Sequence, residues 1–215
     1  MIALIQEKLP KYVDARPFEI QVLTPMRKGL LGVERLNQIL QRYLNPPDSS
    51  RKEHTLGDRL FREGDKVMQI RNNYQMEWEI RGRYGIVIEK GMGVFNGDTG
   101  ILKEINEFAE TATVEFEDGR FADYSFKQLE ELELAYAISV HKSQGSEYPY
   151  VILLMVQSHY IMLQRNLLYT AVTRAKEKVL IVGSKNAVRT AVENDKTKRR
   201  YSLLAERLQE SSEVF

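Results

Sequence analysis

The run Tyr150–Val156 is apolar at every position and has the length of a β-strand. A strand without polar alternation is typical of a parallel sheet that is covered on both faces. A second buried strand is predicted at Lys178–Gly183, and apolar residues at helical spacing lie between the two, at Leu163–Ala175. Strands that alternate with helices predict an α/β fold with helices on both faces of a parallel sheet.

The N-terminal part has the same alternation. Phe18–Leu23 is predicted to be a strand, and Val33–Leu44 an amphipathic helix that ends before a proline pair. Residues 2–9 have the pattern of a short helix, which we expect Pro10 to end.

The middle of the chain has a different character, with short strand patterns and tight turns. Asp118 and Gly119 separate Ala112–Glu117 from Arg120–Tyr124, which is a strong hairpin signal. Closely spaced short strands predict a small antiparallel barrel, which we place at residues 59–131. The α/β part would then consist of residues 1–58 and 132–215.

Composition excludes several classes of protein. Lys and Arg number 31 and Asp and Glu 30, so the formal net charge is +1, which argues against a basic coat or an acidic tail but leaves room for a local basic site. Without cysteine there is no disulfide scaffold or thiolate zinc site, and the three distant histidines predict no metal site. No apolar run approaches the roughly 20 residues that span a bilayer, and the N-terminus lacks a signal-peptide pattern. We therefore expect a cytoplasmic protein without a membrane partner.

A dense polar segment, Ser139–Glu147, follows the predicted strand Ala135–Val140. Polar side chains at the carboxyl end of a strand are typical of an α/β binding crevice. Hydroxyl, amide and lysine groups suit phosphate or sugar oxygens, and Gly145 lets the backbone approach a ligand. A solvated surface loop explains the same residues equally well.

Two further segments have weaker signals. Arg174 lies among small residues in Tyr169–Lys176 and is exposed enough to hold a phosphate with two hydrogen bonds, although an arginine at a helix end explains it more simply. In Gln21–Gly29, Arg27 and Lys28 precede a predicted helix, as in an anion site, although solvated cations are again the simpler explanation.

Taken together, the three segments resemble the superfamily 1 DNA helicases of the RecD-like branch. Ser139–Glu147 is similar to motif V of that family, Thr170–Ala175 to motif VI, and Gln21–Gly29 to motif IV. The segments Gly64–Met68 and Phe95–Gly100 resemble parts of its SH3-like barrel.

The sequence departs from the family pattern at three points. Ser139 replaces the usual threonine, and residues 75–93 are longer than the usual link, so we expect an additional hairpin of unknown purpose. The chain contains no GxxxxGK(S/T) loop to hold a triphosphate. The resemblance therefore implies a second RecA-like domain, formed by residues 1–58 and 132–215 and interrupted by an SH3-like barrel, within a longer helicase.

The resemblance also implies a mechanism. ATP with Mg²⁺ would bind between two RecA-like domains, the first of which would hold the triphosphate and the metal, so that this part alone would be inactive. Cycles of closure would move the protein 5′ to 3′ along single-stranded DNA and unwind a duplex. The implied partners are single-stranded DNA and the N-terminal RecA-like domain, and we expect a monomer. The implied roles are Arg174 as the catalytic arginine finger, Arg27, Gln144, Gly145 and Glu147 at the nucleotide, and Ser139, His141, Lys142 and Ser143 at DNA.

Two other readings remain open. The chain would be a stand-alone module that binds single-stranded DNA or protein and is derived from a helicase, or its barrel would serve protein interaction alone. Four aromatic side chains of the barrel, Tyr74, Trp78, Tyr84 and Phe95, suit base stacking, although core positions explain at least half of them. The basic run Lys196–Arg200 suits phosphate contacts, but a solvated helix face is favoured.

Overall fold

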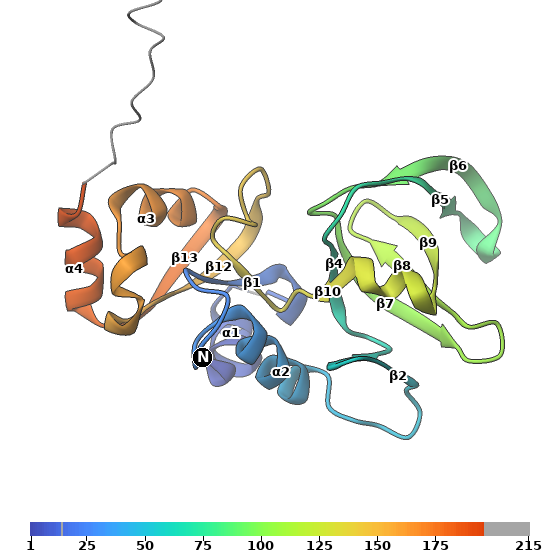
Figure 1. The fold of residues 1–215 in the computed structure, drawn as a ribbon, viewed down its shortest axis with the longest axis horizontal. Coiled ribbons are helices and arrows are strands. Elements are labelled where there is room, and N and C mark those ends of the chain that lie inside the picture. Colours follow the sequence, from blue (N-terminus) through green and yellow to red (C-terminus); the bar gives the residue numbers. More distant parts are fainter. Residues whose placement is uncertain (14, 196–215) are drawn as a thin grey trace, which may run out of the picture.

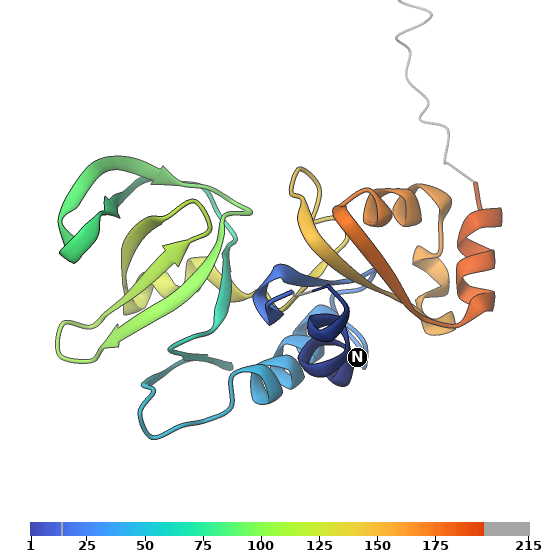
Figure 2. The same ribbon diagram turned by 180° about the vertical axis from the view of Figure 1, so that it is seen from behind.

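The computed structural model describes residues 1–13 and 15–195, so the basic run Lys196–Arg200 lies outside the described residues. Its elements form two halves that lie side by side, an α/β half and an antiparallel half (Figures 1 and 2). None of the helices in the described residues is long and apolar enough to cross a membrane.

A four-stranded parallel sheet forms the centre of the α/β half. Its strands, in sheet order, are β11 (Ala137–Ser139), β1 (Ile20–Thr24), β12 (Tyr148–Met155) and β13 (Ala175–Gly183). The helices are α1 (Leu9–Val13), α2 (Val33–Leu44), α3 (Arg165–Val172) and α4 (Lys185–Glu193), with a π-helical turn, η1 (Leu4–Lys8), before α1.

Strand β12 shows why both faces of the sheet are covered. Leu153 packs in a cluster with residues of α3 and α4, whereas Ile152 packs in a cluster with residues of α1 and α2. Because consecutive side chains of a strand point to opposite faces, an apolar run is required where both faces carry helices. The predicted fold class, a helix-covered parallel sheet with an antiparallel insertion, is confirmed.

Three local predictions are wrong. Lys178–Gly183 was expected to be buried, but β13 is an edge strand, and Ile181 is 41% exposed. The helix expected to reach Ala175 ends at Val172, and Ala175 begins β13. The first helical segment continues past Pro10, which lies in α1 directly after the π-helical turn η1.

The antiparallel half contains a hairpin and a larger sheet. The hairpin is β2 (Glu53–Leu56) with β3 (Arg59–Arg62). The sheet, in order, is β10 (Leu132–Leu134), β4 (Lys66–Gln69), β7 (Thr99–Asn106), β8 (Thr111–Phe116), β9 (Arg120–Ser125), β5 (Asn73–Arg81) and β6 (Val87–Val94). Short 3-10 turns are η2 (Pro17–Glu19), η3 (Arg83–Gly85), η4 (Phe126–Glu131) and η5 (Gln157–Met162).

Two predicted hairpins occur in this sheet. Glu115 pairs with Phe121 across the Asp118-Gly119 turn, and the long segment 75–93 lies in the β5–β6 hairpin. The core of this half includes Phe61, Val114 and Tyr124, which are fully buried.

Candidate functional site

The parallel register brings two of the predicted segments together. Thr24, at the end of β1, pairs with Ser139 at the end of β11, and the amide of Val140 donates to the carbonyl of Thr24 at 3.1 Å. Gln21–Gly29 and Ser139–Glu147 therefore leave the sheet at the same edge, as adjacent parallel strands require.

The loop Ser139–Glu147 is held by its own serines. The Ser143 hydroxyl is buried and donates to the Val140 carbonyl at 2.8 Å, and the Lys142 amide donates to Ser139 Oγ at 3.3 Å. Ser143 therefore lies inside the turn and not on its surface. Gly145 has φ +88°, a conformation that favours glycine.

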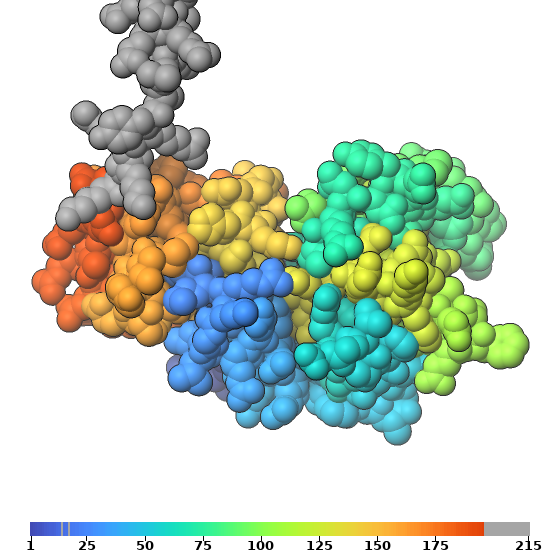
Figure 3. All heavy atoms as spheres, in the orientation of Figure 1, coloured from blue at the N-terminus to red at the C-terminus, as the bar shows by residue number. Residues whose placement is uncertain are grey.

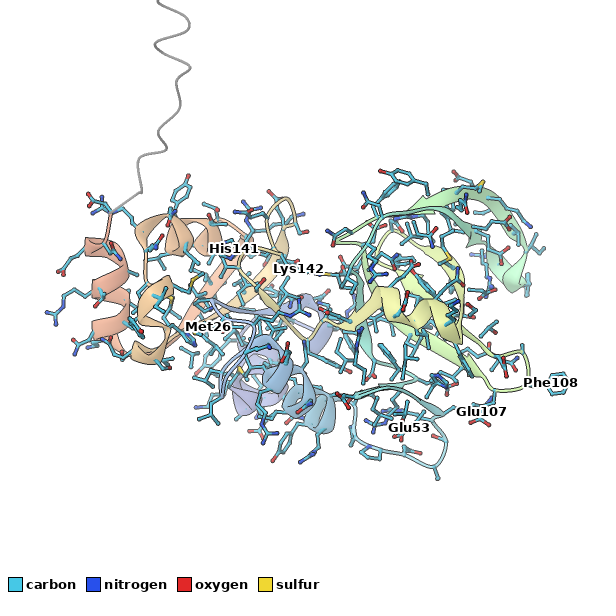
Figure 4. All side chains as sticks on the ribbon, viewed as in Figure 1. Met26, Glu53, Glu107, Phe108, His141 and Lys142 are labelled. Atoms are coloured by element: carbon cyan, nitrogen blue, oxygen red, sulfur yellow. The ribbon has the colours of Figure 1, made fainter. Side chains whose placement is uncertain are left out.

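The other side chains of this loop are accessible. His141, Gln144 and Glu147 are exposed, whereas Lys142 is partly buried. Figure 4 shows Lys142 on the side of the α/β half that faces the antiparallel half, and His141 farther from the antiparallel half. The loop thus presents an imidazole, an amide and a carboxylate to the surface.

Arg174 joins the third segment to this loop. Its Nη1 donates to the Ser146 carbonyl at 2.9 Å, its Nε to the Thr170 carbonyl at 3.2 Å, and its Nη2 to Thr173 Oγ1 at 3.3 Å. No carboxylate of the described residues forms an ion pair with it. Three of the five guanidinium N–H groups are used, so its charge and two donors remain for an anion.

Arg27 is in a different electrostatic state. Its guanidinium forms ion pairs with Glu133 and with Glu34, the latter at 3.4 Å. The hydrogen bond to Glu133 raises the pKa of Arg27. Sequence reasoning missed Glu133, which lies in the short strand β10 and belongs to none of the three polar segments.

Lys142 lies beside this ion pair. It lines a small cavity together with Arg27, Glu133 and Ser139. Burial lowers the pKa of Lys142, and the positive charge of Arg27 acts in the same direction, while Glu133 opposes it. The structure thus brings two predicted cations and one predicted serine to one place.

Glu147 lies at a cleft between the two halves. Its carboxylate is 3.6 Å from Lys176 Nζ, and both side chains are exposed. A cavity of about 250 Å³ is lined by Gly97, Asp98 and Arg120 on one side and by Ser146 and Glu147 on the other. Figure 3 shows a notch here, between the gold loop and the green part of the antiparallel half. In the described residues, no group of His, Asp or Glu side chains is arranged to hold a metal ion.

Comparison with protein families gives two matches. Residues 36–116 match the SH3 domain of ATP-dependent RecD-like DNA helicases, and residues 134–182 match the UvrD-like helicase C-terminal domain.

Individual relatives agree with these matches. The chain is 36% identical over 190 residues to an ATP-dependent RecD2 DNA helicase of Deinococcus radiodurans, covering 87% of the chain and 23% of that protein. It is 30% identical over 178 residues to the RecBCD enzyme subunit RecD of Mycolicibacterium smegmatis, covering 81% of the chain and 27% of that protein. The chain therefore spans only part of the length of these relatives.

A solved structure has the same fold. A crystal structure of Pif1 helicase from Bacteroides, in complex with ADP-AlF3 and ssDNA, matches 99% of the chain and 50% of its own length, with a TM-score of 0.52 at 16% identity. The two domain matches and the relatives assign the chain to the RecD-like superfamily 1 helicases, as the region that carries their SH3 domain and UvrD-like C-terminal domain.

Proposed function

We propose that this chain is the C-terminal motor region of an ATP-dependent DNA helicase that moves along single-stranded DNA, 5′ to 3′, and unwinds duplex ahead of it. Residues 1–58 and 132–215 would act as the second RecA-like domain and residues 59–131 as its barrel insertion, to which β2 and β10 add a strand on either side of these bounds. The observation that carries the proposal is Arg174, whose guanidinium has no acidic partner in the described residues yet is held by Ser146 and Thr170.

The nucleotide side of the proposal follows from charge and access. An arginine whose orientation is fixed and whose charge is not neutralised stabilises the negative charge of a transferring phosphoryl group. Arg174 would supply that charge, and Gln144, Gly145 and Glu147 would contact the nucleotide from the exposed end of the loop. ATP supplies the phosphoryl group, and the ligands of its Mg²⁺ are expected in the preceding RecA-like domain.

Arg27 can contact a phosphate only after its present ion pairs are broken. Its ion pairs with Glu133 and Glu34 neutralise it in this structure. It would contact the γ-phosphate only after exchanging these carboxylates for phosphate oxygens when the two domains close. The relative named an ATP-dependent RecD2 DNA helicase, of which this chain covers 23%, supports the proposal but is a longer protein.

The DNA side rests on His141 and Lys142. Both lie on the loop Ser139–Glu147, where His141 is exposed and Lys142 lines the small cavity with Arg27 and Glu133. Ser139 and Ser143 would position this loop, since their oxygens are used within the turn. The Pif1 structure with ssDNA concerns that protein, and it supports a similar substrate here.

The test is Arg174→Ala in a protein that contains this region together with its ATP-binding domain. Steady-state ATP turnover should fall by about 10³-fold or more, as for loss of an arginine finger. Affinity for single-stranded DNA should change little. The matched control is Arg189→Ala on α4, whose side chain contacts Asn186 and lies on another surface. Turnover close to normal in Arg174→Ala would exclude the finger role.

A further inference from the structure

Two consecutive ionisable residues are buried where the chain enters the larger antiparallel sheet. Asp65 is 0% exposed and Lys66, the first residue of β4, is 4% exposed. Consecutive residues of an extended chain point in opposite directions. Each of the two side chains therefore reaches a different part of the α/β half.

The Asp65 carboxylate connects three segments. Its Oδ2 accepts hydrogen bonds from Gln41 Nε2 at 2.6 Å and from the Arg62 amide at 2.7 Å. Its Oδ1 accepts from Asn45 Nδ2 at 2.8 Å and from the Tyr136 hydroxyl at 2.9 Å. The donors belong to α2 and its C-terminal cap, to the chain entering the sheet, and to the chain returning toward β11.

Lys66 makes the second connection. Its Nζ donates to the Phe18 carbonyl at 2.9 Å and lies 5.9 Å from the centre of the Tyr148 ring. Phe18 lies just before β1, and Tyr148 directly follows the loop Ser139–Glu147. No ion pair of Lys66 occurs in the part of the chain that the structure describes.

A buried ammonium without an ion-pair partner lowers stability. Burial lowers the pKa of Lys66 to about 8, although the negative charge of Glu117 acts in the opposite direction, so the folded protein disfavours the charged form. An apolar side chain of similar size would avoid this cost. The position of Lys66 is therefore better explained by the contact with Phe18 than by a contribution to stability.

Strand β4 connects the buried pair Asp65 and Lys66 to the cleft. At its far end the Gln69 amide donates to the Asp98 carbonyl, and the Gly97 amide donates to the Gln69 carbonyl, both at 2.9 Å. Gly97 and Asp98 form one wall of the cleft whose other wall is Ser146 and Glu147. One short strand thus joins the buried pair to the cleft wall.

We propose that Asp65 and Lys66 are positioning residues that fix the antiparallel half on the α/β half and thereby set the width of this cleft. That this cleft matters for DNA rests on the proposed function. The claim that Asp65 and Lys66 fix the orientation of the two halves does not rest on it. Parts of one chain that are not fixed by a large, hydrophobic interface move relative to each other.

The test measures the orientation directly. The chain has no cysteine, so Glu104→Cys on β7 and Thr190→Cys on α4 give two unique, exposed sites for spin labels. Pulsed electron resonance should give a narrow distribution of distances for the parent chain. In Asp65→Asn and Lys66→Met the distribution should become about twofold broader or more.

Stability separates positioning from simple packing. Lys66→Met should unfold at the same or a higher urea concentration than the parent, because it removes the buried charge, while its distance distribution still broadens. If Lys66 had only a structural role, its replacement would lower stability and leave the width of the distance distribution unchanged. Equal widths for folded Lys66→Met and the parent would overturn the role of Lys66.

Two tyrosines provide a matched control. Tyr136→Phe removes one hydrogen bond to Asp65, between the halves. Tyr124→Phe removes one hydrogen bond to Gln69, within the antiparallel half. Only Tyr136→Phe should broaden the distance distribution. Equal widths for Tyr136→Phe and Tyr124→Phe would overturn the proposal, and this comparison remains possible if Asp65→Asn fails to fold. Because no nucleotide or DNA is used, this result is independent of the Arg174 test.

Discussion

At the scale of single residues, Lys66 predicts an unusual pH dependence. Its pKa is about 8 in the folded protein and 10.5 ordinarily, so between these values the unfolded chain binds more protons. The free energy of unfolding should therefore rise as pH increases from 8 to 10.5, by up to about 3 kcal/mol. Lys66→Met removes this contribution, so the measurement is the difference between parent and variant in urea unfolding at each pH. A difference that does not change across this window would contradict the prediction.

His141 predicts a kinetic difference. Its side chain is exposed and makes no hydrogen bond in the described residues, whereas only its backbone carbonyl takes part in the turn, accepting from the Gln144 amide at 3.3 Å. In a protein that includes the ATP-binding domain, His141→Ala should lower DNA-stimulated ATP turnover more than basal turnover, because only the former requires the DNA contact. The check is turnover with and without single-stranded DNA. Equal losses would argue against a DNA contact.

The residue types in a loop predict its polar character better than they predict where each side chain points. The pattern Ser139–Glu147 correctly identified a polar loop at the end of a strand, yet Ser143 is turned inward to the Val140 carbonyl. Glu133, which neutralises Arg27, was not found because its partner is 106 residues away. Local patterns contain no information on such pairs, which only the sheet topology creates.

At the scale of elements, the β5–β6 hairpin depends on a glycine under an aromatic ring. A Cβ on Gly91 would lie 2.3 Å from Trp78 Cζ2, so Gly91→Ala must displace the ring or the strand. We expect a loss of about 1–3 kcal/mol, as for other overpacked sites. Trp78 is the one tryptophan of the chain, so its emission should shift to longer wavelength as it becomes exposed.

The matched control for this prediction is Gly97→Ala. Gly97 has φ +105° and no atom within 4 Å of a Cβ, so the substitution adds backbone strain without a collision. It should lower stability and leave the Trp78 emission unchanged. Unchanged emission in folded Gly91→Ala would show that the hairpin accommodates the methyl group.

Elements with strong local signals were predicted, and those decided by neighbours were not. The Asp118-Gly119 turn produces its hairpin through backbone preference alone. The burial of β13 depends instead on whether another strand pairs with it, and the described sheet ends there. An apolar pattern such as Lys178–Gly183 does not distinguish a central strand from an edge strand.

At the scale of the whole molecule, charge limits DNA binding by this chain. Its formal net charge is +1, and Arg27, next to the proposed contact loop, is neutralised by carboxylates. Each phosphate contact contributes a slope of about −0.7 to a plot of log affinity against log salt for single strands. We expect a shallow slope that corresponds to few contacts, and weak binding.

Lys142 should account for part of that slope. It lies on the contact loop and has no ion pair within the described residues. A contact between its ammonium group and a DNA phosphate would therefore release a counterion from the DNA. Lys142→Ala should therefore flatten the slope by about 0.7, measured by fluorescence anisotropy of a labelled oligonucleotide over a salt series. Lys185→Ala on α4 changes the net charge equally but away from this loop, and should leave the slope unchanged. Both variants remove one positive charge, and only Lys142 lies on the contact loop. If both flatten the slope equally, affinity depends on the overall charge of the chain and not on a defined site.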